Sequence, residues 1–345
     1  MRPEASRHPR PEAWPAQQEL SLLVAPIVER EQDGAHLNVP GFIGEAAADA
    51  YTATRGVAVV DAPAIQRRLT RSFKALRMTI PDALPTYRLV RGTQPLLVSI
   101  PHVGTHISEV LRGDYTDAAL ELADTDWHLD RLYAFAHEMG ASVLSAVHSR
   151  CVIDLNRPPD NQSLYPGQVT TGLCPVETFR GEPLYRPGCE PDAAEVECRL
   201  GLYWQPYHDA LAEELVRLKA LHGRVLLWEA HSIASRLPRL FDGKLPDLNL
   251  GTADGASCAP ELLAPVVAVA QASGYTSVIN GRFKGGYITR HHGHPAERVH
   301  AIQLELCQCL YMDEQAPFDY LPAQADRLQP VLKAMTGAAL GALGF

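Results

Sequence analysis

The sequence predicts an α/β protein with a mixed, mostly parallel sheet flanked by helices. Five of the six residues in the run 95–100 are apolar and none is charged, which is typical of a strand covered on both faces. A second apolar run, 141–147, follows a stretch with helical spacing, so a β-α-β unit with a right-handed crossover is expected. The 345 residues, 46% of them hydrophobic, can bury a sizeable core.

Apolar spacing and turn residues predict the remaining elements. Leu129, Leu132 and Ala136 recur at helical spacing, so a helix is expected within 121–140. The segment 161–191 is rich in Gly, Pro, Thr and Tyr without a steady period, and such a long connection is expected to cover a functional site. The other expected elements are a strand-like 151–155, a helix in 192–222, a strand in 224–232, a loop over 236–258, a helix in 260–274, and strands in 275–279 and 299–306.

Charge and composition exclude several functional classes. A formal net charge of −9 and a pI of about 5.9 argue against a nucleic-acid or anionic-membrane partner. No stretch approaches the roughly 20 apolar residues of a membrane span, and the N-terminus lacks the apolar segment of a signal peptide, so a cytoplasmic location is expected. The seven cysteines form no C-x-x-C pair and are expected to be free thiols.

The first part of the chain differs in composition from the rest. The first 19 residues are rich in proline and have little apolar periodicity, which is typical of a disordered tail. The residues up to 77 show no regular alternation of strand and helix patterns, although 67–77 could form a short helix. We therefore expect 1–77 to be a partly disordered N-terminal extension and 78–345 to be the catalytic domain, with Met78 as a possible natural start.

Chemically active side chains follow or occupy three of the expected strands. His102 follows the run 95–100, and two later strands contain Glu229 with His231 and then Glu305. Ligands of open α/β sheets bind beyond the carboxyl ends of the strands, so these side chains are expected at one edge. The i, i+2 spacing places Glu229 beside His231, where a carboxylate can hold the imidazole in one tautomer. Each of these residues could instead be a structural group that caps the sheet.

Two histidines and an aspartate at strand ends fit the pattern of a catalytic zinc site with three protein ligands and one open position. The histidines are His102 and His231, and the acid is Asp124 or Asp126, which could also be a helix cap. Glu305 is an isolated acid on a buried face, where a raised pKa would suit a general base.

Two further segments offer groups that bind anions. Asn156 and Arg157 stand together before a double proline, and an amide beside a guanidinium suits bidentate capture of a carboxylate. A surface ion pair of Arg157 with Asp154 or Asp160 is the alternative. The glycine-rich segment 281–295 contains three cationic side chains and three histidines, and it is expected to be an anion-binding loop. Its H-H-G-H sequence could bind metal, but it lacks the spacing of a zinc-binding helix.

Five blocks of sequence carry a resemblance to a known family: S-I-P-H-V-G-T-H, D-T-D-W-H-L-D-R-L-Y, S-R-C-V-I-D-L-N-R-P, W-E-A-H-S and A-I-Q-L-E-L. In this order they resemble the N-formylglutamate deformylase, or amidohydrolase, family of histidine degradation. The resemblance covers about 88–312 and does not extend to 1–77. It implies a fold similar to the zinc carboxypeptidases and aspartoacylase.

The resemblance implies one zinc ion bound by His102, Asp126 and His231, with Asp126 preferred to Asp124. The sequence departs from the H-x-x-E of the carboxypeptidases, because Thr105 stands in the place of the glutamate, and this puts the acidic ligand in doubt.

The resemblance also implies the reaction and its other residues. Water and N-formyl-L-glutamate would give formate and L-glutamate, with Glu305 as general base and Arg150 stabilising the oxyanion. Asn156 and Arg157 would bind one substrate carboxylate, and Arg290 would bind the other.

Three other functions agree with parts of the sequence. An amidohydrolase for another N-acyl dicarboxylic amino acid would need the same two anion sites. A dinucleotide-binding oxidoreductase is disfavoured, since no G-x-G-x-x-G follows an expected strand. A non-catalytic anion-binding protein of the same fold would keep Arg157 but need neither metal nor Glu305. No partner beyond a small-molecule substrate is predicted, and the sequence does not predict an oligomeric state.

Overall fold

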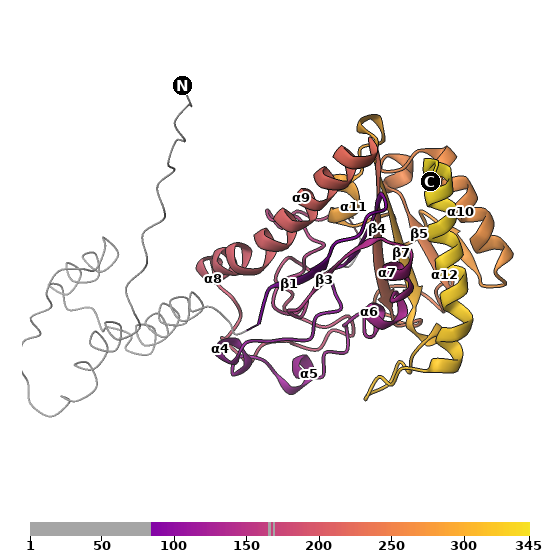
Figure 1. Cartoon of the computed structure of the whole chain (residues 1–345). Coiled ribbons are helices and arrows are strands. Elements are labelled where there is room, and N and C mark those ends of the chain that lie inside the picture. The colour runs from indigo at the N-terminus through magenta and orange to yellow at the C-terminus, as the bar shows by residue number, and fades with distance from the viewer. Residues whose placement is uncertain (1–83, 165–166, 168–169) are drawn as a thin grey trace, which may run out of the picture. The chain divides into compact units, whose positions relative to one another are not determined.

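The structure is a computed structural model that describes residues 84–164, 167 and 170–345 (Figure 1). The expectations for 1–77, for the helix over 67–77 and for Met78 therefore lie outside the described residues. The described strands are β1 (Tyr87–Val90), β2 (Leu96–Ile100), β3 (Ser142–Ala146), β4 (Val225–Ile233), β5 (Leu248–Gly251), β6 (Ser277–Ile279) and β7 (Val299–Cys307).

These strands form one sheet in the order β1-β3-β2-β4-β7-β5-β6. β1 pairs antiparallel with β3 and β5 antiparallel with β7, whereas the other four pairings are parallel. The predicted mixed, mostly parallel sheet is confirmed. β2 and β4 are buried along their whole length, as expected for central strands covered on both faces.

Helices cover both faces of the sheet (Figure 1). The longer helices are α8 (Ala193–Arg199), α9 (Gln205–His222), α10 (Pro260–Ala272), α11 (Tyr287–His292) and α12 (Pro322–Leu343). Single helical turns form α4 (Glu109–Arg112), α5 (Asp117–Leu120), α6 (Leu129–Leu132) and α7 (Phe135–Glu138). A π-helical turn, Leu200–Trp204, joins α8 to α9, and 3₁₀ turns occur at Ala253–Gly255, Pro295–Glu297 and Gln308–Leu310.

Alternating side chains of the strands divide the core between the two faces. On β2, Leu96 and Val98 pack in a cluster with residues of α10 and α12, while Leu97 packs in a second cluster with residues of α9. On β4, Trp228 belongs to the first cluster and Leu227 to the second. The central strands are thereby fixed in register, and their carboxyl ends lie together at one edge.

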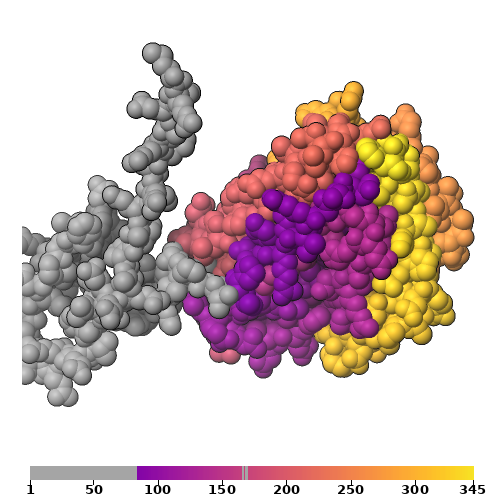
Figure 2. Space-filling view, viewed as in Figure 1, coloured from indigo at the N-terminus to yellow at the C-terminus, as the bar shows by residue number. Residues whose placement is uncertain are grey.

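At the margin of the sheet, β1 is half-buried, and Figure 2 shows this early part of the described chain, in indigo, at the surface. Among the described residues, no helix combines the length and the apolar character that crossing a membrane requires.

The helix expected within 121–140 is wrong in extent. Leu122 and His128 have φ of 56° and 62°, in the left-handed region that a right-handed helix cannot include. The chain therefore forms only the turns α6 and α7, and it makes an irregular bend between Ala123 and His128.

The strand expected at 151–155 is also wrong. The carbonyl of Cys151 accepts a hydrogen bond from Tyr115 Oη at 2.9 Å, and that of Val152 accepts one from Arg199 Nη1 at 2.7 Å. Since side chains bind these carbonyls, the segment is an irregular buried loop rather than part of the sheet.

The remaining expected elements agree with the structure only in part. The expected helix over 192–222 is confirmed as α8, the π turn and α9, and the expected helix over 260–274 as α10. The expected loop over 236–258 contains β5, the expected loop over 281–295 contains α11, and the sequence analysis missed α12. β7 is buried on both faces beyond His300.

Candidate active site

Three segments bring His102, Asp126 and His231 together. His102 follows β2, His231 lies in β4, and Asp126 lies in the irregular bend before α6, where its N–H donates to the His102 carbonyl at 3.0 Å. One ligand atom from each residue lies within 4.8 Å of the others, and all three side chains are buried. His231 Nδ1 is 3.1 Å from Asp126 Oδ2, and His102 Nδ1 is 3.8 Å from the same oxygen.

Each histidine binds a separate carboxylate through its other ring nitrogen. His102 Nε2 is 2.7 Å from Asp154 Oδ1, and His231 Nε2 is 2.7 Å from Glu229 Oε1. A carboxylate partner of this kind fixes the tautomer and ring orientation of a histidine that binds metal. Both Nδ1 atoms are consequently directed toward Asp126. The predicted pairing of Glu229 with His231 is present in the structure.

The residues of this group fit a divalent metal ion. His102 Nδ1 and Asp126 Oδ1 are buried atoms without a hydrogen-bond partner. Leaving such atoms unpaired is unfavourable unless an ion or water occupies the space between them. Two imidazole nitrogens and a carboxylate oxygen are ligands of a catalytic zinc site with an open position. In the part of the chain that the structure describes, this is the only group of its kind.

The electrostatics of the site depend on paired buried charges. Burial acts to lower the pKa of His231, but Glu229 and Asp126 outweigh it and raise that pKa well above its usual value. Burial acts to raise the pKa of Asp154, but His102 and the Arg150 guanidinium hold that pKa well below its usual range. Asp154 is therefore ionised and can order the cationic groups around it.

Asp154 is a central residue that the sequence analysis considered only as an ion-pair partner. Besides His102, its carboxylate accepts hydrogen bonds from Arg150 Nη2 at 2.7 Å and from the Asn156 N–H at 2.9 Å. Arg157 Nε lies 3.9 Å from it. Its position between Arg150 and Arg157 in the sequence was the available signal, but only the fold shows that it also binds His102.

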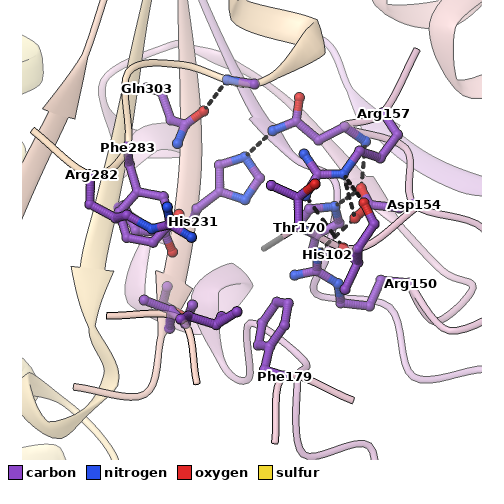
Figure 3. Close-up of a pocket in the computed structure, with 17 residues that line it drawn as sticks. His102, Arg150, Asp154, Arg157, Thr170, Phe179, His231, Arg282, Phe283 and Gln303 are labelled. Carbon is purple, nitrogen blue, oxygen red and sulfur yellow. Dashed lines mark hydrogen bonds and ion pairs between the residues drawn. The ribbon is translucent and has the colours of Figure 1, made fainter. Parts of the chain in front are cut away.

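A cavity opens beside the His-Asp-His group. Figure 3 shows Arg282 and Phe283 on one side of it and Arg150, Asp154 and Arg157 on the other. From the segment predicted to cover a site, Thr170, Thr171 and Phe179 belong to the lining; the remaining lining residues are His102, Asn156, His231, Ser232, Ile233, Leu240, Gly286, Gln303 and Glu305. Positive side chains thus face each other across a partly apolar space.

Glu305 is buried at the end of β7 and lines this cavity. Burial raises its pKa to about 8, against the opposing effect of His231 and with a further increase from Asp126. A carboxyl group with this pKa can take up and release a proton near neutral pH.

Arg157 and Asn156 have different surroundings. Arg157 lines the cavity, and its Nε donates to the Thr171 carbonyl at 2.9 Å. The Asn156 amide is used within the protein, since its Oδ1 accepts from the Ile288 N–H at 2.9 Å and its Nδ2 lies 3.1 Å from His231 Nε2. Because His231 Nε2 donates to Glu229, the amide is held by α11 and only lies beside this histidine.

Two residues considered from the sequence lie outside the group or the cavity lining. Asp124 does not belong to the His-Asp-His group, and its Oδ2 accepts a hydrogen bond from the Phe179 N–H at 2.7 Å. Arg290 is not among the lining residues, and its Nε donates to the Gly285 carbonyl at 2.8 Å. The cation that this segment contributes to the cavity is Arg282, which the sequence analysis did not single out within G-R-F-K-G-G.

Comparison with known proteins agrees with this arrangement. The family model for N-formylglutamate amidohydrolase matches residues 94–312. The chain belongs to this family. The matched residues contain the His-Asp-His group, Glu305 and all three arginines of the cavity, so the family resemblance predicted from the sequence is confirmed.

Members of the N-formylglutamate amidohydrolase family include similar curated proteins. The N-formylglutamate deformylase of Pseudomonas aeruginosa is 55% identical over 246 residues, which cover 71% of this chain and 92% of that protein. The N-formylglutamate deformylase of Pseudomonas putida is 52% identical over 251 residues, which cover 72% of this chain and 94% of that protein.

Solved structures show the same fold. The N-formylglutamate amidohydrolase from Ralstonia eutropha JMP134 has a TM-score of 0.64 and 26% identity, covering 74% of this chain and 98% of its own. A gene product of Agrobacterium tumefaciens, with a TM-score of 0.59 and 18% identity, covers 76% and 97% and shows the fold alone.

Proposed function

We propose that the protein is a zinc-dependent amidohydrolase that converts N-formyl-L-glutamate and water to L-glutamate and formate. The observation that carries this proposal is the buried His102, Asp126 and His231 group, which adjoins a cavity lined by Glu305 and three arginines. The similar Pseudomonas proteins bear the name of this activity.

His102 Nδ1, His231 Nδ1 and Asp126 would hold the metal, since these atoms converge and two of the three residues contain an unpaired buried atom. A zinc ion in such a site polarises a carbonyl group and acidifies a water molecule.

Glu305 is the proposed proton carrier. It lines the cavity from the end of β7, and its pKa of about 8 suits proton exchange near neutral pH. It would accept the proton of the attacking water and deliver it to the amine of the leaving glutamate.

Arg150 is proposed to stabilise the negative charge that develops on the formyl oxygen. Its guanidinium is buried, held by Asp154 at 2.7 Å, and packed 4.7 Å from the centre of the Phe179 ring. A fixed cation in a site of this kind is typically worth a few kcal/mol in the transition state.

The two carboxylates of the substrate would bind on opposite sides of the cavity. Arg157 is proposed for one, as predicted from the sequence. For the other we propose Arg282 in place of Arg290, because Arg282 lines the cavity across from Arg157 whereas Arg290 does not line it (Figure 3). Asn156, which the sequence analysis predicted to bind the same carboxylate as Arg157, is proposed instead to hold α11 beside the bound substrate through the Ile288 N–H.

The remaining parts of the proposal concern context. We propose that 1–77 is an extension to a catalytic domain over 78–345, that the enzyme acts in histidine degradation, and that it is cytoplasmic. The start of the family match at residue 94 supports the domain boundary. A chain beginning at Met78 should fold and hydrolyse the substrate; failure to do either would contradict the boundary.

Formate release by the purified full-length protein tests the reaction. Release from N-formyl-L-glutamate should stop after chelation and return when zinc is added. N-acetyl-L-glutamate and N-formyl-L-norvaline, which lacks the side-chain carboxylate, should be poor substrates. Faster turnover of the acetyl compound would favour another N-acyl substrate, and release that persists after complete metal removal would contradict the zinc mechanism.

A further inference from the structure

The bend that contains Asp126 needs support from outside itself. Its backbone lies between the positive-φ residues Leu122 and His128 and forms no regular element. The carbonyl groups on either side of Asp126, those of Thr125 and Trp127, are consequently not bound within a helix or a strand. Main-chain carbonyls in a protein interior need hydrogen-bond donors, so other residues must supply them.

Two buried side chains supply these donors from one short segment. Gln308 Nε2 donates to the Thr125 carbonyl at 2.9 Å, and Tyr311 Oη donates to the Trp127 carbonyl at 2.9 Å. Gln308 begins the 3₁₀ turn that follows β7, and Tyr311 comes directly after that turn. Both side chains are buried, with exposed fractions of 3% and 0%.

Ser232 connects these two donors to the Asp126 carboxylate. Its N–H donates to Asp126 Oδ2 at 3.2 Å, while its hydroxyl lies 2.7 Å from Tyr311 Oη and 3.4 Å from Gln308 Nε2. The Tyr311 hydroxyl can donate to the Trp127 carbonyl or to Ser232 Oγ, and Ser232 Oγ also accepts from Gln308 Nε2. Ser232 therefore links both donors to the Asp126 carboxylate.

We propose that Gln308, Tyr311 and Ser232 form a ligand clamp that positions Asp126 for the metal. The inference rests on the metal site of the proposed function but not on the identity of the substrate. Asp126 Oδ2 is already bound by the clamp and by His231 Nδ1, so the clamp determines the direction of Oδ1, which has no hydrogen bond and lies 3.9 Å from Arg150 Nη1. These three are positioning residues.

The clamp also relates the acidic ligand to the proposed proton carrier. Glu305 lies in β7, three residues before Gln308 in the turn that follows this strand, and Ser232 follows His231 in the neighbouring strand β4. One continuous segment thus holds both Glu305 and the bend of Asp126. A change in the clamp should alter metal binding before it alters the overall fold.

Tyr311→Phe tests the clamp, because it removes only the hydroxyl. Tyr207→Phe is the matched control: Tyr207 is equally buried, its hydroxyl pairs with Ser99 Oγ at 2.9 Å, and it lies on α9 in the other core cluster. The zinc dissociation constant is measured on the stripped full-length proteins by competition with a chromophoric chelator. The absorption spectrum of bound cobalt reports the ligand geometry.

Tyr311→Phe should weaken zinc binding by about 10- to 100-fold and change the cobalt spectrum, as loss of residues that orient metal ligands typically does. Tyr207→Phe should lower the melting temperature by a similar amount yet bind zinc like the unaltered protein. Equal zinc affinity for Tyr311→Phe and the unaltered protein would overturn the proposal, as would equal weakening in both variants.

If Tyr311→Phe does not fold, Gln308→Met makes the same test, since it removes the donor to Thr125 at nearly constant volume. Different results would contradict the proposed function and the ligand clamp. An unaltered protein that binds zinc but releases no formate contradicts the proposed substrate and leaves the clamp supported or overturned by its own variants. An unaltered protein that binds no metal contradicts both.

Discussion

Two groups of histidines, in two regions of the described residues, differ in what surrounds them. His102 and His231 each bind a carboxylate and face Asp126 beside the cavity. In the second region His208 and His292 stack at 6.1 Å between ring centres, and His291 stacks on Tyr287 at 4.8 Å. Among the described residues, none of the second set belongs to a group that could hold a metal.

Burial lowers the pKa of His102, as it does for the histidines of the second region, but His231 behaves in the opposite way. Glu229 and Asp126 outweigh burial and raise the pKa of His231 well above its usual value. Burial lowers the pKa of His208 to about 4, and burial with the neighbouring His208 lowers that of His292 to about 3. Buried carboxylates, rather than a local concentration of histidines, therefore distinguish the candidate metal site.

Removing the acidic ligand should have the largest effect. Asp126→Asn weakens a charged metal ligand and should lower kcat/KM by about 1,000-fold or more, with loss of bound zinc. Asp124→Asn is the control, because Asp124 belongs to the same D-T-D stretch but lies outside the His-Asp-His group and accepts from the Phe179 N–H. Metal content and formate release check both. Equal loss in the two variants would remove the distinction between these acids.

The carboxylates behind the histidines should come next. Glu229→Gln and Asp154→Asn should each weaken zinc binding by about 10- to 100-fold, because the histidine loses the group that orients it. Glu214→Gln is the control. Glu214, on α9, is also buried, but it binds Ser142 of β3 and Arg217 of α9 rather than a histidine. Calorimetric titration with zinc measures the three. Unchanged zinc affinity in both Glu229→Gln and Asp154→Asn would show that the carboxylates bound to the histidines do not distinguish the metal site from the second histidine region.

Two arginines of the segment 281–295 should differ in their effect on substrate binding. Arg282→Met should raise KM for N-formyl-L-glutamate by about 10- to 100-fold, the value of a hydrogen-bonded charge pair, with a smaller change in kcat. Arg290→Met should change KM by less than about threefold, because Arg290 binds the Gly285 carbonyl outside the cavity lining. Steady-state kinetics measure KM for both variants. A larger increase in KM for Arg290→Met than for Arg282→Met would make Arg290 the second carboxylate-binding residue.

The smallest effect is expected from the second histidine region, and it concerns stability. The unfolded chain binds protons below a pH of about 6.5 that His292 in the native protein does not, so stability falls as the pH falls toward the native pKa of about 3. Replacing His292 with Phe should reduce the loss of stability between pH 7 and pH 5 by about 2 kcal/mol. Urea unfolding at the two pH values measures this, and zinc affinity should stay constant. An unchanged loss would show that His292 titrates normally.

The sequence predicted the parts of the molecule in which local pattern and final structure agree. The uncharged run before His102 forms β2, the i, i+2 pair of Glu229 and His231 lies on one face of β4, and α10 follows its apolar spacing. These features depend on side-chain periodicity, which a sequence displays directly.

The parts that it missed depend on contacts between distant segments. The apolar spacing around Asp126 predicts a helix, but Leu122 and His128 have positive φ and the chain forms a bend there. The loop before Asp154 resembles a strand, but Tyr115 and Arg199 bind its carbonyls from far along the chain. Local spacing carries no information on such partners, and for the same reason Arg282 could not be separated from Arg290.

A crystal of the zinc-loaded protein, measured on both sides of the zinc absorption edge, tests the central claim most directly. The account predicts one strong anomalous peak between His102 Nδ1, His231 Nδ1 and the Asp126 carboxylate. A peak at His291 and His292, or zinc bound in solution without a peak at the His-Asp-His group, would contradict it.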